Sequence, residues 1–126
     1  MATAKTHAPH ALGVWGEEMA TRRLETDGWH VLERNYRHGR HEVDLIAVRR
    51  GILAFVEVKT RSGDTFGPPE EAVTHRKRRE IEKVARDFLR RHTPRDLCVR
   101  FDVVAIVVTR GTHLVRYEHI EDAWRP

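Results

Sequence analysis

The chain has 126 residues, of which 40% are hydrophobic and 33% are charged, and its formal net charge is +4. This length suits one domain with a single core, so we expect residues 1–126 to form a single domain with residues 1–9 as a flexible tail. The N-terminus lacks an apolar signal core, and no apolar run approaches the roughly 20 residues of a membrane helix. The sequence therefore predicts a cytoplasmic protein without a membrane partner.

Cysteine and arginine usage narrow the class of protein further. The lone cysteine, Cys98, excludes an internal disulfide and is expected to fill the core, and no Cys or His spacing is typical of a zinc site. The basic residues are mostly arginines, whose planar guanidinium suits bidentate phosphate contacts. This composition is compatible with a polyanionic partner, although a genome rich in G and C produces the same preference.

Hydrophobic periodicity predicts a helix at the start of the chain and three strands after it. The helix opens at Pro9 and stops at DGW, residues 27–29. The strands are WHVLERNY, HEVDLIAVRR and ILAFVEVKTR, and the RRG turn makes the last two a hairpin. The predicted core face of the helix consists of Leu12, Trp15, Gly16, Met19, Ala20 and Leu24.

The second half of the chain is predicted to contain a second helix followed by two strands. A loop, SGDTFGPP, precedes a helix predicted from Glu70 to His92, and LCVRFDVVAIVV and HLVRYEHI are the last two strands. A strand that follows a long helix can return parallel to the strand before it. The order α-β-β-β-α-β-β therefore predicts an α/β domain in which helices flank a mixed five-stranded sheet.

Charged residues interrupt two of these strands where apolar residues are expected. Glu57 and Lys59 are two positions apart and so share a face of their strand, while Asp44 lies within the apolar run VDLI. An edge strand with one solvated face would explain the first pair. If the two strands are neighbours, however, the Asp44 and Glu57 carboxylates come close enough to repel each other unless a cation joins them.

A divalent metal resolves that repulsion and suggests a chemistry. Mg²⁺ binds one or two carboxylates, keeps several waters and contacts phosphate oxygens, so Asp44 and Glu57 are predicted metal ligands. Lys59 lies beside them, where the scissile phosphate or a metal-bound water needs a positive charge. Asp44, Glu57 and Lys59 are therefore the predicted catalytic residues of phosphodiester hydrolysis.

The strand motifs resemble a known superfamily. VDLI followed by FVEVKTR resembles the core of the PD-(D/E)XK nuclease-like superfamily, which includes Holliday junction resolvases and restriction enzymes. GVWGEEMA, NYR, HEVDLI, FVEVKTR and RFDVV occur in the order of its YraN-like family of bacterial proteins, so the resemblance extends from Gly13 to about Val104. It implies a restriction-endonuclease-like fold, Mg²⁺ or Mn²⁺ as cofactor, and a nucleic-acid partner, in the first place DNA.

The resemblance also implies further residues of the site. Glu17 would be a third metal ligand, and small neighbours on its helix, Gly13 and Ala20, leave room for it to approach the sheet; a solvated glutamate is the alternative. A resolvase-like enzyme that cuts two symmetric strands would act as a homodimer. The family pattern has glycine where this chain has His41; the histidine either abolishes the bend that a glycine would allow or is tolerated because regular alternation points it away from Asp44.

Basic residues around this site are predicted to support it or to bind nucleic acid. Lys77 extends the apolar stripe of the second helix toward the sheet, where it either supports the site or snorkels to solvent. Asp102 is predicted to be a structural partner of Arg100. The residues predicted to contact nucleic acid, with a plain solvated face as the alternative, are Arg37, Arg61, Arg76, Arg78 and Arg79.

Two functions follow from the sequence. The first is a Mg²⁺-dependent nuclease that hydrolyses phosphodiester bonds in DNA, including branched or processed intermediates. The second is a non-catalytic module for nucleic-acid or protein binding on the same fold, because a fold alone does not establish an activity. A third alternative is a small stable protein in which Glu57 and Lys59 form a purely structural ion pair, and it predicts no DNA binding.

Overall fold

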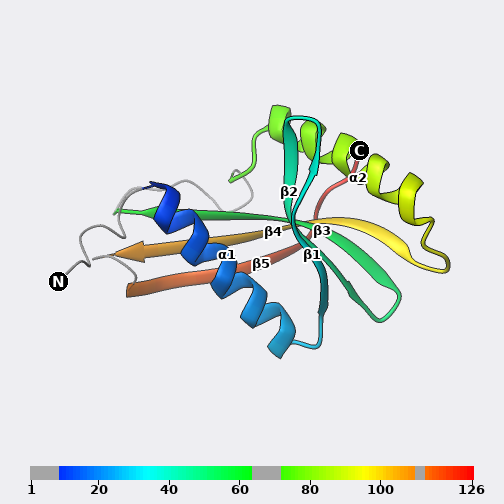
Figure 1. The fold of residues 1–126 in the computed structure, drawn as a ribbon. Coiled ribbons are helices and arrows are strands. Elements are labelled where there is room, and N and C mark those ends of the chain that lie inside the picture. Colours follow the sequence, from blue (N-terminus) through cyan, green and yellow to red (C-terminus); the bar gives the residue numbers. More distant parts are fainter. Residues whose placement is uncertain (1–8, 64–71, 110–112) are drawn as a thin grey trace.

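The computed structural model describes residues 9–63, 72–109 and 113–126. Within these ranges, two helices flank one five-stranded sheet (Figure 1). The elements are α1 (Pro9–Thr26), β1 (His30–His38), β2 (His41–Arg49), β3 (Ile52–Ser62), α2 (His75–His92), β4 (Cys98–Thr109) and β5 (His113–Trp124). This order confirms the predicted mixed α/β fold.

The strands lie in the sheet in the order in which they occur in the chain, from β1 to β5. β3 and β4 are parallel, and each other neighbouring pair is antiparallel. The parallel pair arises because α2 carries the chain from the end of β3 back to the start of β4, as the predicted crossover requires.

Alternation along β3 divides the core into two layers. Leu53 and Phe55 belong to the core beneath α2, whereas Ala54 and Val56 belong to the core beneath α1. The two helices therefore cover opposite faces of the sheet. Full burial of a large apolar side chain contributes about 1.5–3 kcal/mol. The buried helical members are Leu12, Ala20 and Leu24 in α1, and Ile81, Val84, Ala85 and Phe88 in α2.

β2 and β3 pair along only part of their lengths. Their register runs from Arg49 opposite Ile52 to Leu45 opposite Val56. The first residues of β2 remain paired with β1, and this hairpin rises toward α2, away from the rest of the sheet (Figure 1). The separation of β2 from β3 leaves polar side chains room between the two strands.

α2 begins later than the sequence suggested. Thr74 caps the helix by accepting a hydrogen bond from the Lys77 backbone N–H at 3.2 Å, and the buried residues Ala72 and Val73 precede it outside the helix. The predicted start at Glu70 is therefore too early, because the described residues 72–74 precede the helix. Glu70 itself lies outside the described residues. Thr93, in the left-handed region at φ 39°, ends the helix.

Four other expectations concern Cys98, the N-terminal tail, Asp102 and membrane helices. Cys98 is exposed at the start of β4 rather than buried, because the apolar run enters the core only further along the strand. Pro9 belongs to α1, and residues 1–8 of the expected tail lie outside the described residues. Asp102 is fully buried and accepts two 2.9 Å hydrogen bonds from Arg100, which confirms their pairing. Neither described helix is apolar enough over sufficient length to cross a membrane.

Candidate metal and nuclease site

Asp44 occupies the point at which β2 separates from β3. Its side chain is largely buried, at 8% relative exposure. One carboxylate oxygen, Oδ2, accepts a hydrogen bond from the Val58 backbone N–H at 2.8 Å, just beyond the last backbone pairing between the strands. The carboxylate thus bridges the two strands where their ladder ends.

Glu57 approaches Asp44 from β3. Its side chain is 13% exposed, and its Oε1 atom is buried with no hydrogen-bond partner among the described residues. Its other oxygen, Oε2, lies 3.8 Å from Nζ of Lys77 on α2. A buried carboxylate oxygen without a donor carries a desolvation cost, which a bound cation would offset.

Glu17 reaches the same site from α1, on the opposite face of the sheet from α2. Its half-buried carboxylate interacts with Asp44 and with the side chain of Asn35 on β1. The approach of α1 depends on Gly16: a Cβ added there would lie only 1.9 Å from Thr60 Oγ1 on β3. The predicted trio of carboxylates, Glu17, Asp44 and Glu57, is therefore brought together.

Asn35 is a site neighbour that the sequence did not identify as functional. Its neighbours in β1, Arg34 and Tyr36, pair with Leu45 and Val43, so Asn35 stands opposite Asp44. Its backbone is in the left-handed region at φ 53°, which asparagine tolerates better than most residues. This tolerance is the only local signal, and the contact with Glu17 depends on tertiary packing.

Burial and the charge of Asp44 increase the proton affinity of the other two carboxylates. Burial, and then the charge of Asp44, raises the pKa of Glu57 to about 9. The same two causes raise the pKa of Glu17 to about 7. Burial also raises the pKa of Asp44, although the hydrogen bond from Val58 opposes the shift. At neutral pH the metal-free site therefore retains protons, and binding a cation would release them.

These shifts predict a stability that falls with rising pH. Glu57 and Glu17 bind protons more tightly in the folded chain than at their ordinary pKa of 4.5, so the metal-free fold loses stability from about pH 4.5 to about pH 9. Each group contributes a slope of at most about 1.4 kcal/mol per pH unit. Urea unfolding in EDTA at pH 6, 7.5 and 9 measures the trend.

Other buried acids do not produce the same trend. Asp87 and Asp102 have lowered pKa values, because hydrogen-bonded basic neighbours outweigh their burial, so the stability they contribute is already present above their ordinary pKa of 3.8. A free energy of unfolding that is constant or increasing between pH 6 and pH 9 would contradict the predicted coupling of the carboxylates.

The donor set fits a hard divalent cation. Among the described residues, no three His, Cys, Asp or Glu side chains already stand in the arrangement of a complete metal site. Mg²⁺ requires only one or two carboxylates, however, and takes its remaining ligands from water and substrate phosphate. Asp44 and Glu57 supply those carboxylates, the unpartnered Glu57 oxygen is available, and Glu17 lies beside them.

The two predicted lysines occupy different positions. Lys59 is exposed on β3, two residues beyond Glu57, and lies opposite Ala105 of β4. Lys77 is the lysine that contacts Glu57, at 3.8 Å. A purely structural ion pair between Glu57 and Lys59 is therefore not what the structure contains. The charge of Lys77 opposes the rise in the pKa of Glu57 without cancelling it, whereas Lys59 is exposed to solvent.

The predicted nucleic-acid-binding arginines do not form one group. Arg76 is 91% exposed and Arg79 is exposed beside it on α2, whereas the guanidinium of Arg78 packs over the Trp124 ring, 5.4 Å from its centroid. Arg37 pairs with Glu42 at 3.3 Å. Arg61 is half-buried on β3. Of the three arginines of α2 that were predicted to bind nucleic acid, Arg76 and Arg79 are thus the ones best placed for a ligand.

His41 points toward α2. Its Nδ1 atom lies 3.6 Å from a carboxylate oxygen of Glu80. The expectation that it avoids Asp44 agrees with this contact, and the side chain becomes part of the surface between β2 and α2.

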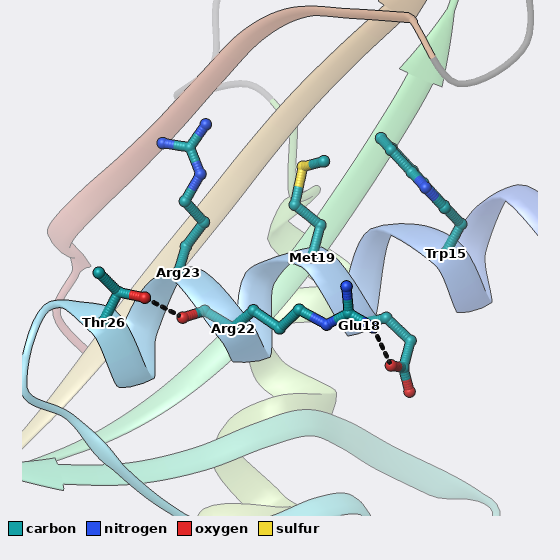
Figure 2. A pocket seen from close by; sticks show the side chains of 6 residues that line it. All are labelled: Trp15, Glu18, Met19, Arg22, Arg23 and Thr26. Atoms are coloured by element: carbon teal, nitrogen blue, oxygen red, sulfur yellow. Dashed lines mark hydrogen bonds and ion pairs between the residues drawn. The ribbon is translucent and has the colours of Figure 1, made fainter.

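A separate hollow of about 390 Å³ lies along α1 (Figure 2). Trp15, Met19 and Arg23 project from the helix on the same side, and the Arg23 guanidinium lies over the Tyr117 ring, 4.5 Å from its centroid. Glu18, Arg22 and Thr26 complete the lining. None of the residues predicted for the metal site lines this hollow.

Comparison with known proteins places these residues in a family context. Residues 16–106 match the model of the uncharacterised protein family UPF0102, a span that contains Glu17, Asp44, Glu57, Lys59 and Lys77. A UPF0102 protein of Rhodococcus jostii is 47% identical over 117 residues, covering 90% of this chain and 96% of its own. Another, of Chloroherpeton thalassium, is 43% identical over 112 residues, covering 89% and 87%.

Proposed function

The chain belongs to the UPF0102 family, the YraN-like family that its motifs resemble. Because that family is uncharacterised, we propose a function from the site itself: a metal-dependent nuclease that hydrolyses phosphodiester bonds in DNA. The observation that carries the proposal is the convergence of Asp44, Glu57 and Glu17 from three elements on one partly buried point. A bound cation would relieve the mutual repulsion of these carboxylates in their ionised form.

Each residue has a defined part in this proposal. Asp44 and Glu57 would hold Mg²⁺ or Mn²⁺, with Glu17 as the third carboxylate near it. The cation, when bound, lowers the pKa of water and polarises the phosphoryl oxygen. Asp44 accepts a hydrogen bond from the Val58 N–H, so its carboxylate is oriented by the backbone rather than only by mobile side chains. Lys59, exposed beside the carboxylates, would stabilise the negative charge that develops on the phosphate.

A direct assay tests the proposal. Purified protein is incubated with labelled single-stranded, duplex, flap and four-way-junction DNA in Mg²⁺, Mn²⁺ or EDTA, together with Asp44→Ala. Cleavage is expected only with a metal ion and an intact Asp44. Paired cuts in a symmetric junction would indicate a homodimer, and the corresponding RNA substrates test the choice of DNA.

Lys59→Ala is expected to lower the cleavage rate by about 10²–10³-fold, because it removes a cation aimed at the developing charge. Its stability and its affinity for Mn²⁺ should remain near those of the wild type, since Lys59 is exposed and is not a metal ligand. Arg50 is an exposed cation in the turn at the far end of the β2–β3 hairpin, so Arg50→Gln is the matched control and should cleave DNA at the wild-type rate. Equal rates for Lys59→Ala and the control would remove Lys59 from the mechanism.

A non-catalytic binding module is the second candidate. It is favoured by the contact between Lys77 and Glu57, because a lysine beside the buried carboxyl offsets part of the cost of its burial without a metal. If the wild type binds DNA but cuts no substrate in either metal, this second function replaces the nuclease.

A further inference from the structure

A basic cleft lies between α2 and the beginning of β2. It has a volume of about 580 Å³ and is distinct from the hollow along α1. Its lining side chains come from the first half of α2 and from His41 at the start of β2; Figure 1 shows these two segments close together. We call it the α2–β2 cleft, and it is lined by His41, His75, Arg76, Arg79, Glu80 and Lys83.

The charge of the α2–β2 cleft is strongly unbalanced. Three cations, Arg76, Arg79 and Lys83, face a single carboxylate, Glu80. Glu80 lies 3.6 Å from both Arg76 and His41, so its charge is already shared. Arg79 donates a hydrogen bond to Nε2 of His75 at 2.9 Å, and this contact with an imidazole leaves its cationic charge uncompensated. A concave surface with excess positive charge attracts an extended anion.

Both segments that line the cleft continue toward the carboxylates Asp44 and Glu57. In β2, His41 is three residues before Asp44, a distance of about 10 Å along a strand. In α2, Arg76 is adjacent to Lys77, which contacts Glu57. A nucleic-acid strand advances about 3.4 Å per nucleotide along a duplex axis, so the cleft is about three nucleotides from the carboxylates.

Resting on the proposed function, we propose that the α2–β2 cleft binds the phosphate backbone of the substrate strand, about three nucleotides to one side of the scissile phosphate. Arg76, Arg79 and Lys83 supply the charge. The contacts are with phosphate, so they position the strand without reading its sequence. Arg78, which packs on Trp124, is not part of this surface.

The test compares two variants that remove the same number of charges. Arg76→Gln/Arg79→Gln neutralises the cleft, and Arg22→Gln/Arg95→Gln neutralises two exposed arginines elsewhere. Binding of labelled duplex and single-stranded DNA is measured by fluorescence anisotropy in EDTA, at several salt concentrations. The cleft variant should bind at least about tenfold more weakly and lose about 0.9 from its salt slope on duplex for each broken contact. The control should stay within about twofold of the wild type.

Equal losses in the two variants would show that only net charge matters and would overturn the inference. So would wild-type affinity in the cleft variant, or failure of the wild type to bind DNA at all, which would direct the search to acidic protein partners. Because the measurement needs no turnover, it separates the two proposals. If the cleft variant alone loses DNA binding and the wild type cleaves no DNA in any metal, the cleft is supported and the nuclease is rejected. If the wild type cleaves DNA and the cleft variant binds it as well as the wild type does, only the cleft is rejected.

Discussion

Glu57→Gln is expected to abolish metal-dependent cleavage, with a loss of at least about 10³-fold, and at the same time to stabilise the metal-free protein at alkaline pH. The variant keeps the shape of the side chain but cannot donate a carboxylate to the metal. It also removes the group whose pKa burial and Asp44 raise to about 9, so no proton must be lost from the buried site as the pH increases.

The two effects have opposite signs, which separates a functional from a structural role. At pH 9 the free energy of unfolding should exceed that of the wild type by on the order of 2 kcal/mol, whereas at pH 5, where the wild-type carboxyl is protonated, the two should nearly agree. Urea unfolding in EDTA and the cleavage assay provide the measurements. Glu25→Gln, an exposed residue of α1, is the control. A Glu57→Gln protein that is less stable than the wild type at both pH values would contradict the prediction.

Gly16→Ala is expected to destabilise the fold by about 1–3 kcal/mol and to lower cleavage at least about tenfold. The new Cβ would lie 1.9 Å from Thr60 Oγ1 and 3.1 Å from Thr60 Cβ, so α1 must move away from β3. The higher helix propensity of alanine, worth about 1 kcal/mol, offsets only part of this cost. Glu17 is the next residue, and the displaced helix carries its carboxylate away from Asp44.

Thermal unfolding and cleavage rates of two further variants identify the cause. Gly13→Ala, in the same helix with no atom within 4 Å of an added Cβ, should be as stable as the wild type or more so. Thr60→Ala removes the obstructing hydroxyl, which is buried without a hydrogen-bond partner among the described residues, and should restore most of the stability and activity of Gly16→Ala. If Gly16→Ala behaves like Gly13→Ala, close helix–strand contact does not position Glu17.

The hydrogen-bonded acids of the fold illustrate which side-chain roles can be recognised in a sequence. The pairing of Asp102 with Arg100 was predictable because two positions of one strand share a face. Its remaining partners, His119 at 2.8 Å and the Asp122 N–H at 3.0 Å, come from β5 and became apparent only with the strand pairing. Local periodicity gives the direction of a side chain, whereas its partners depend on distant segments.

The sequence by itself determined the order of elements, the mixed sheet, the family, and the convergence of Asp44 and Glu57, because each depends on local periodicity or on motifs within neighbouring strands. Only the tertiary structure decided that Lys77, rather than Lys59, contacts Glu57, that Asn35 stands opposite Asp44, and that the helix begins beyond Val73. It also formed the α2–β2 cleft. These features depend on where β2 separates from β3 and how closely each helix packs, which are properties of long-range packing that a one-dimensional pattern does not encode.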